Sequence, residues 1–442
     1  MLSRTTLHVR AFLLTLRVLA KATGHNTAKK SVSFKPKKDQ TVGKAKKGGM
    51  THHEFREAVT QLGYEKGAQP LQVPELTSVE SLGNLYKYSD ATKSKFNELK
   101  VIQPYQHHEM FSEPISMTTT NTEQILKQVL SKLQGPSKDN RVCLVGAKGI
   151  GKSTLLMQAM ALANTLDATQ APVFLHIPNA NAIVDGLSDY ILNQKTGKYQ
   201  QPMFTKRWIW KLKNANADVF KQLKLSRDFT YEKDRKEVTL VKGENTVYDL
   251  LNDCHDFGKY GPTNAFQFFV EELQHQSQNV PVLVTIDRAN GLFDFPVTEY
   301  RHADFSLVHV SQLEIGDWLL KVVSGEFNFA KGGVILAQSS DFSAHRKSMK
   351  VGLGLESHSP YEKAWLFDID IANAMLANGG VKPIQVAPFT KDETSKLLEF
   401  YQQAGVLQAT QGETEFTKIA NNQYTLSGGN PWFLVQAAAF AY

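Results

Sequence analysis

Gly146–Ser153 reads GAKGIGKS, and the segments on either side of it decide the fold. Directly before it, RVCLV (141–145) is a short apolar run of the kind that forms a buried strand. Directly after it, TLLMQAMALAN (154–164) repeats its apolar residues with the spacing of a helix. A strand, a glycine-rich turn and a helix in this order predict an α/β domain whose turn binds phosphate.

Such a loop binds phosphate by directing backbone N–H groups and the N-terminus of a helix toward it. Glycines allow the tight path, Lys152 is expected to reach the β and γ phosphates, and Ser153 is expected to coordinate Mg²⁺. The predicted nucleotide contacts in this segment are Gly146, Ala147, Lys148, Gly149, Ile150, Gly151, Lys152, Ser153 and Thr154. The motif therefore predicts a P-loop nucleotide site.

A magnesium–phosphate site also needs a carboxylate at the end of a neighbouring strand. VPVLVTIDRAN (280–290) supplies Asp287 after a β-favouring run, and we predict that Asp287 and Ser153 hold the metal. The alternative is an ordinary turn residue at a strand end. The next residue is Arg288, where many related ATPases carry a Glu that orients the attacking water. We therefore assign no catalytic residue and expect slow hydrolysis at most.

Apolar runs at 141–146, 172–177, 281–287, 333–338 and 384–388 alternate with helical stretches. This order predicts a parallel sheet flanked by helices, in a P-loop NTPase of AAA- or STAND-like type, with ligand at the carboxyl ends of the strands. One of these runs, GGVILAQSS (332–340), ends in two serines. We assign Ser339 to the site, although Ser340 or a simple capping role remains an alternative.

The C-terminal segment SGGNPWFLVQAAAF (427–440) reads as a turn followed by an apolar helix, with Pro431 at its first position. In AAA- and STAND-type proteins a similar element forms the start of a lid helix that covers the base of the nucleotide. That similarity places Asn430 and Pro431 near the nucleotide, whereas a plain helix start is the alternative. We predict that 389–442 forms a small helical lid.

The predicted nucleotide-binding domain spans 121–388, preceded by a lead-in region at 51–120 and interrupted by a long insertion at about 186–262. The insertion contains a candidate hairpin, RDFTYEKDRKEVTLVKG (227–243), and the segment KRWIWKLK (206–213). Cations mixed with aromatics suit an RNA-contacting surface, but a helix packed by its tryptophans, with its lysines in solvent, is the favoured interpretation. Residues 290–312 are expected to form an aromatic-rich loop for partner contact or packing.

The net charge of +7 is concentrated at the amino terminus. Residues 1–50 hold twelve Lys or Arg against Asp39, and the remainder carries 38 bases and 42 acids. The overall basicity therefore does not identify the folded body as an RNA-binding surface. Residues 1–30 have the basic amphipathic pattern of a mitochondrial transit peptide, with a basic flexible linker at 31–50; a basic tail is the alternative. No apolar run approaches the ~18 residues of a membrane span.

Five features occur in one order in this sequence. They are the P-loop, the strand that ends in Asp287 without a following Glu (the Walker B strand), NGLF (290–293), TEYRHADF (298–305) and SGGNPWFL (427–434). In this order they resemble the death-associated-protein family in its fungal form, GTP-binding proteins of the mitochondrial small ribosomal subunit. The resemblance covers about 50–442. It implies a matrix location, bound GTP or GDP (ATP less so) with Mg²⁺, and contacts with ribosomal RNA, small-subunit proteins and the large subunit. We do not expect the protein to form a homo-oligomer. Guanine does not follow from the residues, because no clear NKxD motif follows Asp287.

Two functions remain in competition at this point. One is a structural ribosomal protein that holds guanine nucleotide. The other is an active AAA- or STAND-type ATPase or GTPase acting as a switch or remodelling factor, which would need a catalytic carboxylate. A cell-death adaptor role rests only on the family's name.

Overall fold

The computed structural model describes residues 73–79, 82–102, 114–166, 171–233, 236–254, 261–340, 346–359, 361, 363, 367–404, 407 and 413–439. All of them belong to one compact unit, 54–442. The predicted transit peptide at 1–30 and basic linker at 31–50 lie outside the described residues, as does the start of the lead-in region.

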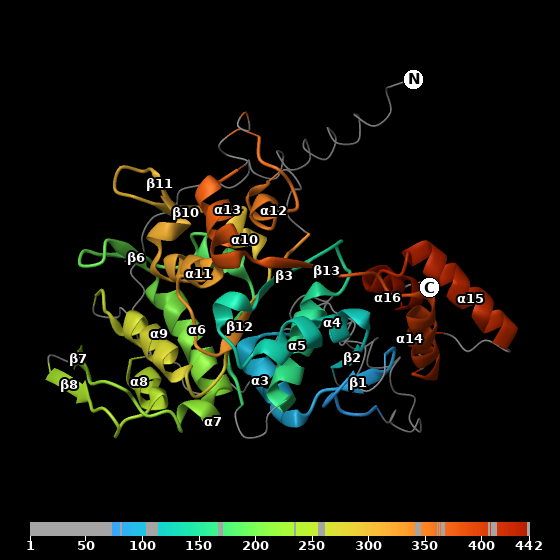
Figure 1. Cartoon of the computed structure of the whole chain (residues 1–442), viewed down its shortest axis with the longest axis horizontal. Coiled ribbons are helices and arrows are strands. Elements are labelled where there is room, and N and C mark those ends of the chain that lie inside the picture. The colour runs from blue at the N-terminus through green and yellow to red at the C-terminus, as the bar shows by residue number, and fades with distance from the viewer. Residues whose placement is uncertain are drawn as a thin grey trace, which may run out of the picture. The chain divides into compact units, whose positions relative to one another are not determined.

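A parallel five-stranded sheet forms the centre of this unit, with helices flanking it (Figure 1). Its strands are β3 (Arg141–Val145), β4 (Val173–Ile177), β9 (Val282–Ile286), β12 (Gly332–Ala337) and β13 (Lys382–Gln385). They lie in the order β13-β3-β12-β9-β4, and every neighbouring pair is parallel. The five predicted strands and their parallel arrangement are therefore confirmed.

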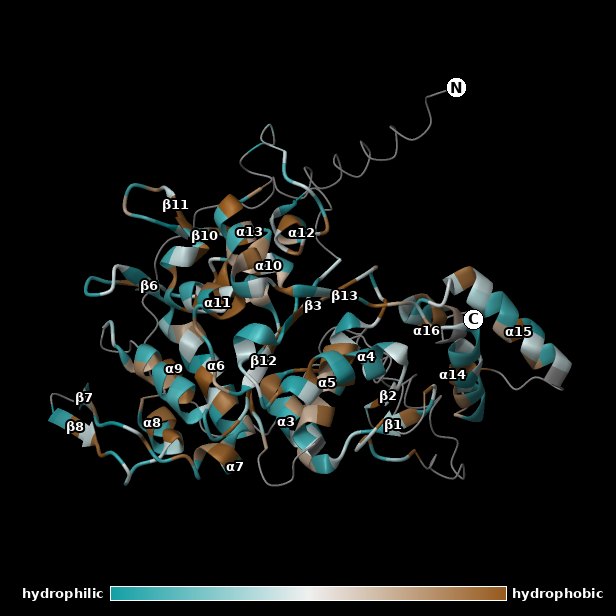
Figure 2. Ribbon diagram, in the orientation of Figure 1, coloured by the Kyte–Doolittle hydropathy of each residue, from teal (hydrophilic) through white to brown (hydrophobic). Residues whose placement is uncertain are grey.

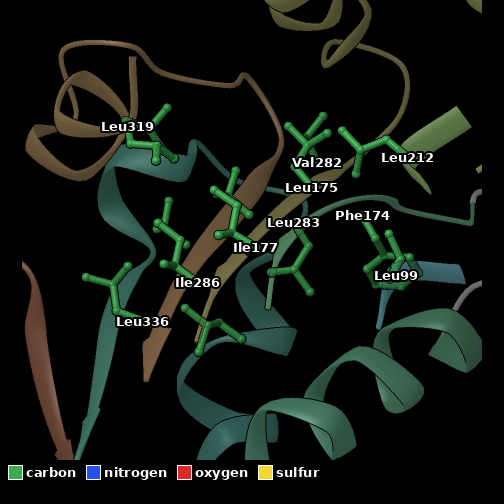
Figure 3. Close-up of a cluster of buried hydrophobic side chains, with 14 of the residues drawn as sticks. Leu99, Phe174, Leu175, Ile177, Leu212, Val282, Leu283, Ile286, Leu319 and Leu336 are labelled. Atoms are coloured by element: carbon green, nitrogen blue, oxygen red, sulfur yellow. The ribbon is translucent and has the colours of Figure 1, made fainter. Parts of the chain in front are cut away.

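The central strands are buried along their whole length, which explains their unbroken apolar sequences. Figure 3 shows part of this core, where side chains of β4, β9 and β12 meet Leu99, Leu212 and Leu319 from three helices. Those helices are α3 (Asp90–Leu99), α6 (Pro202–Ala215) and α11 (Glu314–Ser324). Hydrophobic and hydrophilic segments alternate along the flanking helices, as expected when one face covers a sheet (Figure 2).

The elements around the glycine-rich segment follow the predicted strand–loop–helix order. Helix α5 (Lys152–Leu166) comes directly after the loop, and α4 (Thr120–Gln128) leads toward β3 through short helical turns at Leu130–Lys132 and Ser137–Asp139. In the lead-in region, β1 (Leu85–Lys87) and β2 (Ile115–Met117) pair antiparallel. Gln158 of α5 donates to the carbonyl of Met117 in β2 at 2.8 Å, which joins this pair to the sheet domain.

The insertion between β4 and β9 contains both helices and hairpins. The predicted hairpin is confirmed as β7 (Phe229–Lys233) paired with β8 (Lys236–Leu240). The other elements are the helical turn Ala180–Ile183, β5 (Ile191–Asn193), β6 (Lys198–Gln200), α6, α7 (Ala217–Phe220), α8 (Val247–Asp253) and α9 (Ala265–Gln276). KRWIWKLK lies within α6, so the segment is helical, as the packing interpretation required.

Residues 290–312 are not the loop that we predicted. They form α10 (Asn290–Phe293), a hairpin of β10 (Val297–Arg301) and β11 (Leu307–His309), and a helical turn at Val310–Gln312. Along β10, buried Thr298 and Tyr300 alternate with exposed neighbours. This two-residue period is a strand signal that the abundance of aromatic residues obscured.

After β12, α12 (Ser348–Gly352) and α13 (Ile369–Leu376) precede a turn at Ala377–Gly379 and then β13. Three helices follow: α14 (Lys391–Gln403), α15 (Glu413–Ser427) and α16 (Pro431–Ala439). They have a small core of their own, in which Leu398, Tyr401 and Leu434 pack with Ile115 and Met117 from β2. Within the described residues, no helix is long and apolar enough to cross a membrane.

Candidate functional site

The glycine-rich loop, Gly146–Ser153, connects the carboxyl end of β3 to the first turn of α5. Gly146, Gly149 and Gly151 have φ angles of +153°, +76° and +98°, which side chains with a Cβ rarely adopt. The glycines are therefore required by the backbone path, as predicted. Because α5 begins at Lys152, the N–H groups of its first turn have no partners within the helix and point toward the loop.

The side chain of Lys152 folds back against the loop, and only 7% of the residue's surface is exposed. Its Nζ donates to the carbonyl oxygens of Gly146 at 2.9 Å and Ala147 at 2.7 Å, and to the hydroxyl of Ser340 at 3.0 Å. The Ser340 hydroxyl in turn donates to the Gly146 carbonyl at 3.0 Å. The ammonium group, with its three donors, is thus held beside the backbone that would surround a phosphate.

Asp287 follows β9 directly and is 4% exposed. Burial raises the pKa of its carboxyl group, while a hydrogen bond with the Ser153 side chain and one with the backbone N–H of Arg288 act in the opposite direction. The Arg288 N–H donates to Oδ1 at 2.8 Å. The structure therefore brings together Ser153 and Asp287, the two side chains predicted to hold Mg²⁺.

These two oxygen-bearing side chains suit Mg²⁺, which is commonly bound through one or two protein ligands together with phosphate and water oxygens. The described part of the chain contains no group of three or more His, Cys, Asp or Glu side chains that could hold a metal ion. Cys143 and Cys254 are free and buried. A metal at this site would therefore depend on oxygens from a bound ligand.

The end of β12 joins the site through two consecutive serines that differ in role. The backbone of Ser339 is held by the Asn290 side chain, whose Nδ2 donates to the Ser339 carbonyl at 2.6 Å and whose Oδ1 accepts from its N–H at 2.7 Å. It is Ser340, the alternative to Ser339, whose hydroxyl contacts Lys152. Asn290, which we did not predict as a site residue, aligns the ends of β9 and β12.

The C-terminal segment contacts the glycine-rich loop, through residues close to those that the sequence predicted. The side chain of Asn430 donates to the Lys148 carbonyl at 2.8 Å and accepts from the N–H of Trp432 at 3.0 Å. A Cβ on Gly149 would come within 2.3 Å of the Cβ of Trp432, so only glycine fits there. Pro431 begins α16 beside the same loop.

A cavity adjoins the loop between the segment before β3 and the C-terminal helices. It is lined by Met117, Thr119, Asn121, Ile150, Gly151, Thr154, Leu155, Gln158, Val386, Phe389, Leu397, Tyr401, Pro431 and Val435. Asn121 holds one wall in place, because its amide donates to the Ala387 carbonyl and accepts from the Ala387 N–H, both at 3.0 Å. Gln158 holds another wall by donating to the Met117 carbonyl at 2.8 Å.

The sequence predicted the loop, the proximity of Ser153 and Asp287 and the C-terminal contact, but not this cavity. Asn121 and Ala387 lie 266 residues apart, and no local pattern marks either of them. We predicted neither of them as a site residue.

The fold and the site together define an α/β protein with a glycine-rich loop and a buried carboxylate at the carboxyl edge of a parallel sheet. The chain belongs to the mitochondrial ribosomal death-associated protein 3 family, whose model matches residues 116–437. Relatives include a protein of Schizosaccharomyces pombe, 26% identical over 368 residues, covering 80% of this chain and 70% of the relative. Another, from Neurospora crassa, is 23% identical over 378 residues, covering 82% and 75% respectively. Both are named small ribosomal subunit protein mS29.

Proposed function

We propose that this protein is a structural component of the mitochondrial small ribosomal subunit that holds a guanine nucleotide, GTP or GDP, together with Mg²⁺. Membership of a mitochondrial ribosomal family and the names of two fungal relatives support the ribosomal part of the proposal. Its partners would be small-subunit proteins and ribosomal RNA in the mitochondrial matrix, with contact to the large subunit, and it would act as a single copy.

The nucleotide part rests on one observation, the convergence of Lys152, the Ser153–Asp287 pair and the cavity on a single loop. Loop N–H groups and Lys152 would bind the phosphates, and Ser153 and Asp287 would hold Mg²⁺. The cavity lies next to Gly151 and Thr154, so it is the place for the nucleoside. The mixture of apolar walls and a few polar groups suits a base and a sugar.

The strand order supports assignment to the AAA- and STAND-like P-loop proteins. The strand before the loop, β3, is separated from the Asp287 strand, β9, by β12. This intervening strand brings Ser340 to Lys152. Helices α14–α16 follow the last strand, and Asn430 and Trp432 at the start of α16 contact the loop, as part of a lid would.

The proposed role of the nucleotide is structural. A general base next to the metal-binding carboxylate would be needed for fast turnover, and Arg288 occupies that position. An arginine side chain offers hydrogen-bond donors and no acceptor, so it does not serve as such a base. Hydrolysis would therefore be slow, and the bound nucleotide would stabilise the contact between the sheet domain and the C-terminal helices.

The nucleotide part is tested by releasing small molecules from the purified full chain with acid and identifying them by chromatography and mass spectrometry. We expect a guanine nucleotide in near-stoichiometric amount. Recovery of adenine nucleotide alone would refute the choice of guanine. Rapid turnover of GTP or ATP would favour the competing function, an active ATPase or GTPase that acts as a switch or remodelling factor. The ribosomal part is tested separately by sedimentation of mitochondrial lysate, where migration wholly away from the small subunit refutes it.

Asp287→Asn should have opposite effects on the ligand-free and the liganded protein. A raised pKa means that the folded state holds the Asp287 proton more tightly than the unfolded state. The contribution of Asp287 to wild-type stability therefore decreases as pH rises from the ordinary pKa of 3.8 through the raised pKa. Because Asn does not titrate, the ligand-free variant should become more stable than wild type across that range, whereas its stabilisation by GTP should lose its dependence on Mg²⁺.

Thermal melts in steps from about pH 4 to about pH 8, with and without GTP and Mg²⁺, measure both effects. Thr285→Ser, which alters the same strand without changing charge, is the control. If the ligand-free Asn variant is less stable than wild type at every pH, the carboxylate stabilises the fold directly and the interpretation is wrong.

A further inference from the structure

Helix α6 carries two tryptophans with different surroundings. Trp208 is 4% exposed, its Nε1 donates to the His176 carbonyl at 2.8 Å, and its ring packs against Phe266 and Trp318. Trp210, two residues later and therefore on another side of the helix, is 48% exposed. The core explains Trp208, but it does not explain a large aromatic ring at position 210.

The ring of Trp210 is supported from within the protein by a buried cation. Lys213 is 4% exposed, and its Nζ lies 4.3 Å from the centroid of Trp210 and 5.3 Å from that of Tyr248. The same Nζ donates to the Asn252 side chain at 3.1 Å, which anchors it. A cation against one part of the ring holds its orientation. The exposed half of the indole is therefore presented to solvent in a defined position.

Positive charge surrounds this ring. Arg207 lies one turn before Trp210 on α6, Lys211 follows it, and Lys100 ends α3, the helix that packs beside α6 (Figure 1). The pKa of Lys211 is lowered by burial first and then by the charges of Lys100 and Arg207, so each of these two cations lies close enough to Lys211 to act on it. An anion placed beside this group would relieve the repulsion felt by Lys211.

Two carboxylates on the same and neighbouring helical segments already have partners. Glu98 accepts a hydrogen bond from Asn214 at 3.4 Å, one turn beyond Trp210, and Asp218 forms an ion pair with Lys95 at 3.0 Å. Neither carboxylate is among the charges that shift the pKa of Lys211. The charge at the ring therefore suits an anionic partner.

We propose that Lys100, Arg207, Trp210 and Lys211, which we call the α6 surface, bind unpaired nucleotides of ribosomal RNA. A base would stack on the exposed half of Trp210, and the three cations would contact the flanking phosphates. An acidic protein would satisfy the cations but would not use an exposed, oriented indole in this way. The choice of ribosomal RNA rests on the proposed ribosomal function, whereas the surface itself rests on the contacts above.

The test uses the full chain and a labelled, mixed-sequence, single-stranded RNA of about 20 nucleotides, with binding followed by fluorescence anisotropy. Trp210→Leu keeps an apolar side chain but removes the ring, and should weaken binding about 5-fold or more; Trp210→Phe should retain most of the affinity. Arg207→Gln with Lys211→Gln should reduce the slope of log affinity against log salt by about 1.4, as expected for two phosphate contacts.

Matched controls separate this surface from the basic amino terminus, which is identical in all variants. Lys382→Gln with Lys418→Gln removes the same charge from exposed positions elsewhere, and Phe305→Leu removes another exposed aromatic ring. Both should bind RNA like wild type, and thermal melts should show all variants folded. The proposal is overturned if Trp210→Leu binds RNA like wild type. It is also overturned if Lys382→Gln with Lys418→Gln reduces the salt dependence of binding as much as Arg207→Gln with Lys211→Gln does.

Intact small subunits provide the second measurement. Ultraviolet crosslinking followed by mass spectrometry should find RNA attached to the peptide that contains Trp210. A chemical crosslink from this peptide to another protein, without attached RNA, would overturn the proposal in favour of a protein partner. Failure of the wild-type chain to sediment with small subunits would instead refute the proposed function, while the measurements on purified protein would still decide whether the surface binds RNA.

Discussion

In Lys152→Ala, GTP with Mg²⁺ should no longer raise the melting temperature of the protein. Lys152 is the cation held at the loop by Gly146, Ala147 and Ser340, and its three donors would transfer to phosphate oxygens on binding. In wild type, ligand at 100 to 1,000 times its dissociation constant should stabilise the fold by about 3–4 kcal/mol. Thermal melts with and without ligand measure the difference, and we expect the variant to lose nearly all of it.

Lys132→Ala is the matched control, because Lys132 is an exposed lysine of the same domain in the turn before β3. It should respond to ligand like wild type. Equal shifts in wild type and Lys152→Ala would show that the loop does not bind phosphate. A lower rate of incorporation into small subunits is the further result expected of Lys152→Ala if the nucleotide serves assembly.

Gly149→Ala should destabilise the protein by about 2–5 kcal/mol and also remove its response to nucleotide. Two effects add at this position. The residue has a φ of +76°, which costs an alanine about 1–2 kcal/mol. Its Cβ would also lie 2.3 Å from the Cβ of Trp432, so α16 would have to move away from the loop. Urea unfolding gives the first quantity, and melts with ligand give the second.

Gly428→Ala isolates the steric effect, because Gly428 has a φ of +59° and a Cβ added there would meet no atom within 4 Å. It should cost only the backbone strain of about 1–2 kcal/mol and leave the response to nucleotide intact. If Gly149→Ala and Gly428→Ala lose the same stability and nucleotide still stabilises both, the contact between the loop and α16 has no role in the site.

The features that could be predicted from sequence are those whose signals are local. Five apolar runs predicted the sheet, and GAKGIGKS predicted both the loop and the position of Lys152. Asp287 could be placed beside Ser153 because parallel strands end at a common edge. The hairpin around Tyr300 had a local signal too, the two-residue alternation of VTEYR, but its short length made it easy to read as a loop.

The features that could not be predicted depend on distant partners. Asn290 holds Ser339, and Asn121 holds Ala387, through amide groups whose roles only the folded chain reveals. The same is true of Trp208 and Trp210. The sequence shows two tryptophans on one helix, but which of them is buried depends on how α6 rotates against β4 and α11.

The contact between Asn430 and Lys148 joins residues 282 positions apart. A ribosome synthesising this chain therefore completes the entire strand–loop–helix motif long before the segment that covers it has been made. A chain terminated early, after Ser427, would retain every residue of the octapeptide and still lack this bond and the whole of α16. Chains truncated at the extreme carboxyl end should consequently behave like variants with a substitution in the loop. A search of their sequences for the octapeptide alone would wrongly classify the loop as functional.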